Sequence, residues 1–277
     1  MPMVGLLRFY RVFSGGKVGS ARLAFYPLAG FCLNARFEPW LFAADLAVVL
    51  PGVLFATALN DYYDYKLEGE GNALGRALER GAKLKTLFAV PLLLPFAALY
   101  PLWTLGAPPV SIAALFACLA LAVLYCAPPF RWKKKGLLGV LAPPLGLYLT
   151  FIQAALLTGP LDEVGAAYAF VVLLFSFYLE FVHLADDASR ENEVRRMEFD
   201  AAKRRAVAVS AAAVLACAMF TAISLVFAVS AVFWYLRFSA ARGLDGASLP
   251  EKRSSPFSSI YRIEDFPITL ALIMALK

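Results

Sequence analysis

Residues 41–68 read LFAADLAVVLPGVLFATALNDYYDYKLE, an apolar run over 41–59 that ends in a cluster of carboxylates. Asn60, Asp64 and Glu68 recur every four residues, so on a helix they share one face, and Asp61 lies beside them. A carboxylate that faces hydrocarbon costs roughly 2.5 to 3.5 kcal/mol on insertion scales, so such acids belong where water or a cation reaches them. The stretch therefore predicts a membrane helix with an acidic end.

The composition of the whole chain indicates a polytopic membrane protein. Of its 277 residues 61% are hydrophobic and 17% charged, which is too apolar for an ordinary soluble domain. A membrane helix needs about 20 residues, with a lower limit near 17. We predict an all-α fold, a single domain (1–277) of about nine transmembrane helices around a central cavity that opens near the cytoplasmic face. The apolar runs lie at about 21–35, 41–59, 86–105, 110–127, 137–158, 164–185, 205–220, 221–238 and 266–277.

One segment leaves the number of helices open. Residues 206–236 are long for one helix and short for two, and no Gly or Pro marks a turn, so eight helices is the alternative. The positive-inside rule favours nine. With a cytoplasmic N-terminus, the cytoplasmic segments hold 24 of the 26 Lys and Arg residues, including those in the motif loops 60–85, 125–136 and 183–205.

The net charge of +6 does not indicate nucleic acid, because the basic residues flank the apolar runs. Anionic lipid headgroups explain most of them. We therefore predict a multi-pass integral protein of the cell or inner membrane, with the lipid bilayer as a partner and no nucleic acid.

A second acidic stripe follows about 120 residues after the first. His183, Asp187 and Glu191 repeat the four-residue spacing where another apolar run ends. Magnesium prefers oxygen ligands and often bridges one or two carboxylates to substrate phosphates. The two stripes together predict a Mg²⁺ site and a phosphorylated substrate, whereas any single acid could simply be a solvated loop residue.

The segment YCAPPFRWKKKG (125–136) carries the opposite charge. Pro128 and Pro129 should end the preceding helix, since neither can donate to the turn before it. Arg131 and Lys133 then emerge at the cytoplasmic surface, where a guanidinium and an ammonium bind phosphate oxygens well. The alternative, which we favour for Lys134 and Lys135, is a positive-inside anchor.

Together these motifs resemble the UbiA superfamily of intramembrane prenyltransferases. The family's Asn-Asp-x-x-Asp-x-x-x-Asp motif is matched up to Glu68, which replaces the last Asp. Its Arg-Pro-Leu-x-x-Gly element is similar to residues 76–81 without the proline, and its Tyr-x-x-Pro-Pro-x-Arg-x-Lys signature is reproduced in full at 125–133. The second acidic motif departs from the family, since it keeps Asp187 and Glu191 and loses its first two positions.

The resemblance implies a prenyltransferase that moves an isoprenyl group from its diphosphate to a small aromatic or hydroxyl acceptor with help from Mg²⁺. A terpene cyclase of the same superfamily, or a non-catalytic membrane transporter or scaffold, remains an alternative. The resemblance assigns catalysis to Asp61, Asp64, Asp187 and Tyr125, diphosphate binding to Asn60, Arg76, Arg131 and Lys133, and the metal to Asp61, Asp64, Glu68, Asp187 and Glu191.

Overall fold

The computed structural model of the chain divides into two units, residues 1–160 and 161–277. It describes residues 13–14, 17–18, 25–34, 38–69, 71–189, 196–244 and 265–276. These residues are mainly helical, and the one β-ladder among them is minimal: β1 (Phe13–Ser14) pairs antiparallel with β2 (Lys17–Val18). The all-α class expected from the composition is confirmed.

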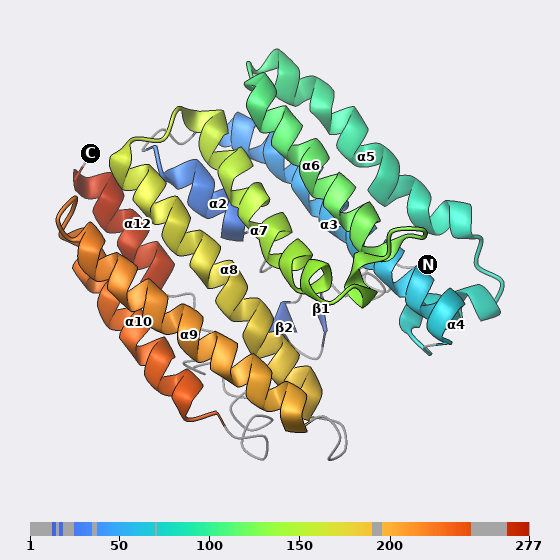
Figure 1. Cartoon of the computed structure of the whole chain (residues 1–277). Helices are drawn as coiled ribbons and strands as arrows, with labels where there is room; N and C mark the ends of the chain where they lie inside the picture. Colours follow the sequence, from blue (N-terminus) through green and yellow to red (C-terminus); the bar gives the residue numbers. More distant parts are fainter. Residues whose placement is uncertain are drawn as a thin grey trace. The chain divides into compact units, whose positions relative to one another are not determined.

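The first unit is a helical bundle. Helix α3 contacts α5 and α6, while α7 contacts α6 and α2. In Figure 1, α3, α5 and α6 run side by side and the short α4 lies at the end of α3. The helices are α2 (Phe25–Cys32), α3 (Pro39–Glu68), α4 (Ala73–Glu79), α5 (Leu84–Thr104), α6 (Pro109–Cys126) and α7 (Leu137–Thr158), with a 3₁₀ turn η2 (Trp132–Lys134) before α7.

Helix α3 is longer than the hydrocarbon layer. Its 30 residues at 1.5 Å each span about 45 Å, against about 30 Å for the layer. Pro39 starts the helix, where its missing N–H costs nothing, and Gly69 ends it with a left-handed φ of 72°. The acidic last turns can therefore extend beyond the apolar layer while remaining helical.

Small residues let α2 and α7 approach closely. A Cβ on Gly30 would clash with the carbonyl of Phe151 and lie 2.8 Å from the nitrogen of Ala155. Ala154 and Ala155 are themselves fully buried. Small residues are what membrane helices use for close backbone contact.

The second unit is built from α8 (Glu163–Ser189), α9 (Arg196–Phe220), α10 (Val226–Arg242) and α12 (Asp265–Leu276). Helix α9 contacts α8 and α10, and α10 contacts α12. Phe175, Tyr178 and Trp234 form part of its core, with both Phe175 and Tyr178 edge-on to the indole. The segment 206–236 therefore forms parts of two helices, and hydrogen-bonded turns at 221–225 separate them without Gly or Pro.

Four of the described helices are long and apolar enough to cross a membrane, namely α3, α6, α7 and the part of α8 up to residue 185. They make the chain an integral membrane protein. All nine apolar runs coincide with helices in the described ranges. That all nine helices cross the bilayer stays a prediction.

Candidate active site

Two of the three acids near the end of α3 are buried inside the first unit, whereas Glu68 in the last turn is exposed. Asp61 and Asp64 are only 4% and 6% exposed. The amide of Asn60 donates to Asp64 Oδ2 over 2.7 Å, as the four-residue spacing predicts. Asn72 caps α4 by accepting from the N–H of Gly75, and it donates to the main-chain carbonyl of Asp61 over 2.7 Å. The cap of α4 thus fixes the turn of α3 that carries the acids.

The connection between α6 and α7 brings basic side chains to the same place. Helix α6 ends at Cys126, one residue before the sequence Ala127-Pro128-Pro129, so the two prolines end it as predicted. The peptide bond between the prolines is cis. Arg131 then takes a left-handed conformation with φ of 42°, which costs a residue with a Cβ about 1 to 2 kcal/mol. The 3₁₀ turn η2, which carries Lys133, begins at the next residue.

Acidic and basic side chains meet in what we call the charge cluster: Asn60, Asp61, Asp64, Glu68, Arg131, Lys133 and Lys134. Lys133 Nζ pairs with Asp64 Oδ1 and lies 3.5 Å from both Glu68 Oε1 and Asn60 Oδ1. Arg131 pairs with Glu68, whose second oxygen lies 3.0 Å from Lys134 Nζ. Two motifs more than 60 residues apart in the sequence therefore form one site.

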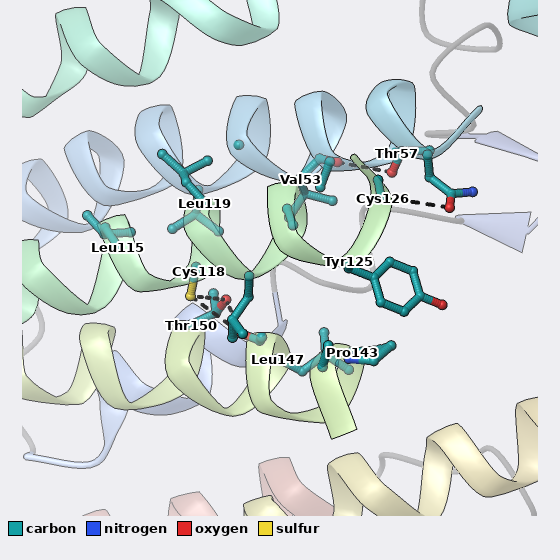
Figure 2. Close-up of a pocket in the computed structure, with 18 of the residues that line it drawn as sticks. Val53, Thr57, Leu115, Cys118, Leu119, Tyr125, Cys126, Pro143, Leu147 and Thr150 are labelled. Carbon is teal, nitrogen blue, oxygen red and sulfur yellow. Dashed lines mark hydrogen bonds between the residues drawn. The ribbon is translucent and has the colours of Figure 1, made fainter. Parts of the chain in front are cut away.

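An apolar pocket of about 410 Å³ opens beside this cluster between α3, α6 and α7. Its volume lies within the range of about 300 to 1,000 Å³ typical of small-molecule sites. Asn60, Asp61 and Tyr125 line its polar end. Figure 2 shows Tyr125 and Leu115 at opposite ends of the pocket, with Cys118 and Thr150 on the wall between them. A ligand that fits has a polar head and an apolar tail.

The remaining predicted site residues are Arg76, Asp187 and Glu191. Arg76, on α4, donates to the carbonyl of Gly71. Asp187 lies in the last turn of α8, where its side chain is not among those described, and Glu191 lies outside the described residues. Whether the second acidic stripe faces the first therefore stays a prediction.

Three buried polar residues deeper in the first unit were not predicted from the sequence. Asp45, Ser111 and Gln153 come from α3, α6 and α7, and none is exposed to solvent. The signal for Asp45 was a carboxylate inside the run 41–59, which we interpreted as uniformly apolar. No motif or spacing in the sequence marks Ser111 or Gln153 as a member of a buried polar group.

The charge cluster offers suitable ligands for magnesium. Asp61, Asp64 and Asn60 present carboxylate and amide oxygens, the donors that Mg²⁺ prefers. Among the residues described, no group of three or more His, Cys, Asp or Glu side chains is gathered tightly enough to hold a metal ion. Lys133 and Arg131 pair with Asp64 and Glu68 instead. The donor chemistry fits the metal if a phosphate draws the basic side chains away from the acids.

No family model matches the chain, and no curated protein matches it. Solved structures do. A UbiA homologue from Archaeoglobus fulgidus bound to GPP and Mg²⁺ superposes with a TM-score of 0.67 at 16% identity, over 98% of this chain and 96% of that chain. The chain has the UbiA fold. A UbiA homologue from Archaeoglobus fulgidus bound to DMAPP and Mg²⁺ gives a TM-score of 0.65 at 14% identity, and one bound to Cd²⁺ gives 0.64 at 15% identity. Each match covers 98% of this chain and 96% of the other.

The resemblance inferred from the three motifs is thus confirmed at the level of the UbiA fold. The identities are low, so the fold match does not depend on overall sequence similarity. Within this fold the charge cluster and the pocket beside it form the candidate active site.

Proposed function

We propose that the chain is an intramembrane prenyltransferase of the UbiA superfamily. It would move an isoprenyl group from its diphosphate to a small aromatic or hydroxyl acceptor. The observation that carries the proposal is a cluster of acids and bases beside one end of an apolar pocket. That arrangement complements a ligand with an anionic head and a hydrocarbon tail. Two of the solved structures with the same fold hold GPP or DMAPP with Mg²⁺.

Arg131 and Lys133 are the residues we assign to the diphosphate. Each pairs with a carboxylate, so each has the charge and the reach to pair with a phosphate oxygen at the same spot. The planar guanidinium suits two oxygens at once, and the ammonium acts as a mobile point charge. Asn60 lies within 3.5 Å of Lys133 and belongs to the same subsite. Arg76 would join only if it left the carbonyl of Gly71.

Asp61, Asp64 and Glu68 are the proposed magnesium ligands in the first unit. For Asp187 and Glu191 the proposal rests on their four-residue spacing in the sequence alone. Magnesium, when bound, offsets negative charge on the leaving diphosphate. The burial of Asp61 and Asp64 keeps bulk water from competing for these oxygens.

In the proposed reaction the allylic carbon–oxygen bond breaks and its electron pair leaves with the diphosphate. A carbon or oxygen of the acceptor then bonds to the allylic carbon and loses a proton. Tyr125 lines the polar end of the pocket, where its ring can stabilise positive charge by about 0.5 to 2 kcal/mol. Leu119, Ala122 and Leu147 line the wall and exclude water that would capture the cation.

We also propose that the charge cluster faces the cytoplasm and that the N-terminus lies on the same side. The support is the distribution of Lys and Arg, of which 24 of 26 fall in segments assigned to that side. Fusing a reporter to the end of α6 and another to the end of α7 would test this orientation.

The test of function uses purified full-length protein in lipid vesicles with geranyl diphosphate, magnesium and candidate acceptors such as an aromatic acid, a chlorin alcohol or a glycerol phosphate. We expect a prenylated acceptor by mass spectrometry. Asp64→Ala should abolish both turnover and magnesium-dependent diphosphate binding. Lys134→Ala is the matched control, because it removes a more exposed charge from the same cluster.

Near-normal transfer by Asp64→Ala would refute the metal assignment. A cyclic hydrocarbon or alcohol formed without any acceptor would identify a cyclase instead. Failure to bind geranyl diphosphate at all would favour a transporter or scaffold. For Arg131→Ala we expect weaker diphosphate binding, and an unchanged affinity would make Arg131 a membrane anchor.

A further inference from the structure

A hydrogen-bonded polar layer crosses the first unit at the deep end of the pocket. Gln153 Nε2 donates to Asp45 Oδ1 over 2.6 Å and lies 3.4 Å from Ser111 Oγ. The hydroxyl of Ser111 donates in turn to the main-chain carbonyl of Gln153 over 2.9 Å. The layer links α3, α6 and α7, which are the three helices that enclose the pocket.

The layer lies one helical turn beyond the deepest pocket residues. Asp45 precedes Val49 by four positions on α3, and Ser111 precedes Leu115 by four on α6. On α7, Gln153 follows Thr150 by three. Residues three or four apart stack on one helix face, so all three polar side chains lie on the faces that the pocket follows. Val48, Val49 and Leu115 belong to one hydrophobic core cluster of buried residues.

A hydrocarbon chain that entered this layer would lose free energy of binding. One oxygen of each partner, Asp45 Oδ2 and Gln153 Oε1, has no hydrogen-bond partner among the described residues. A prenyl tail offers no donor to them. If it separated Asp45 from Gln153, it would also break their hydrogen bond where no water replaces it, which makes the separation costly.

We infer that the Asp45–Ser111–Gln153 layer is the floor of the pocket and sets the longest prenyl tail that the site accepts. The inference rests on the proposed function. From Cys126 at the polar end to Leu115 above the floor, α6 rises about 16 Å at 1.5 Å per residue. Three backbone bonds span about 3.8 Å, so the four carbon–carbon bonds of an isoprene unit span about 5 Å. The pocket therefore holds about three units, the length of a farnesyl group.

The first measurement is magnesium-dependent binding of dimethylallyl, geranyl, farnesyl and geranylgeranyl diphosphate to the full-length protein. We expect the first three to bind and geranylgeranyl diphosphate to bind about tenfold more weakly than farnesyl diphosphate, which corresponds to about 1.4 kcal/mol. Binding of none of them would refute the proposed function together with the floor. Equal binding of farnesyl and geranylgeranyl diphosphate would leave the proposed function standing and refute the floor alone.

The second measurement repeats the series with the floor removed. The double variant Asp45→Ala/Gln153→Ala takes away both partners, so it leaves no side chain of the pair unsatisfied. We expect it to bind geranylgeranyl diphosphate within about threefold of farnesyl diphosphate. Asp45→Asn is the control, since its amide oxygen can still accept from Gln153 and should preserve the wild-type limit. A double variant that keeps the wild-type limit would overturn the inference.

A third variant keeps the test decisive if the double variant does not fold. Gly146 lines the pocket on α7, and a Cβ built there meets no atom within 4 Å. Gly146→Leu would fill the space above the floor without a clash at Cβ. We expect it to lose farnesyl binding and to retain dimethylallyl binding. Unchanged farnesyl binding would show that the tail lies elsewhere and that the layer is not its floor.

Discussion

Replacing Lys133 by Met should destabilise the protein and expose its acidic end to magnesium. Lys133 pairs with Asp64 and lies 3.5 Å from Glu68, and the two side chains of the Lys133–Asp64 pair are 14% and 8% exposed. Methionine keeps the volume of the lysine stem and removes the charge. The carboxylate of Asp64 would then stay buried with the amide of Asn60 as its remaining side-chain donor in the charge cluster.

The expected loss of stability follows from the burial of the Lys133–Asp64 pair. Removing one partner of a fully buried ion pair costs about 3 to 5 kcal/mol. Because the Asn60 hydrogen bond survives and the pair borders the pocket, we expect about 2 to 3 kcal/mol, which is at or below the lower limit for a fully buried pair. For a chain of this size each kcal/mol moves the unfolding midpoint by about 2 to 4 °C, which gives a fall of about 4 to 12 °C.

Thermal unfolding in detergent, with and without magnesium, measures both effects. Lys134→Met is the matched control, because Lys134 pairs with Glu68 but is 55% exposed. An exposed pair contributes about 0 to 1 kcal/mol, so its midpoint should hardly move. Magnesium should stabilise Lys133→Met more than the wild type, since the freed carboxylate can bind the ion in the folded state.

The double variant Asp64→Asn/Lys133→Met separates this explanation from loss of packing. It removes both charges, so it should recover most of the stability that Lys133→Met loses. If the double variant is no more stable than Lys133→Met, the buried charge is not the cause. If Lys133→Met unfolds at the wild-type temperature, the ion pair contributes nothing and the reasoning fails.

Two further predictions concern the scaffold around the site. Asn72→Ala removes the cap of α4 and the hydrogen bond to the carbonyl of Asp61, so it should lower the stability by about 1 to 2 kcal/mol and weaken magnesium-dependent diphosphate binding. Asn72→Asp should keep the cap, and equal diphosphate affinity in Asn72→Ala and wild type would contradict this prediction. Gly30→Ala should force α2 away from α7 and lower the unfolding midpoint by an amount that corresponds to about 1 to 3 kcal/mol, while Gly146→Ala, with open space at Cβ, should not.

The helices were the part of the fold most accessible from the sequence. Apolar runs of membrane length leave the backbone no alternative to helix, because every N–H and C=O must be satisfied internally. The division of 206–236 into two helices could not be predicted with the same certainty, since its turn at 221–225 contains neither Gly nor Pro. The distribution of Lys and Arg along the chain favoured two helices there, and no turn residue did.

The candidate site was predicted in its components but not in its pairing. Four-residue spacing on one helix fixed the relation of Asn60 to Asp64, which the structure confirms. The pairing of Lys133 with Asp64 depends on the tertiary fold, which the spacing of residues along the sequence does not reveal. The role of Gln153 could not be predicted for the same reason, because its polar partner Asp45 lies on a different helix.

The charge balance of the cluster explains why metal and diphosphate should bind together. Asp61, Asp64 and Glu68 carry three formal negative charges, and the three basic residues of the cluster carry three positive ones, so the cluster is close to neutral. A diphosphate that draws Arg131 and Lys133 away leaves the acids uncompensated, and a Mg²⁺ ion that takes the acids leaves the bases uncompensated. Each ligand alone therefore breaks ion pairs, whereas both together replace every pair that is lost. Since coupling between two ligands is reciprocal, magnesium should raise diphosphate affinity by the same factor by which diphosphate raises magnesium affinity, and independent binding of the two would contradict the exchange of partners.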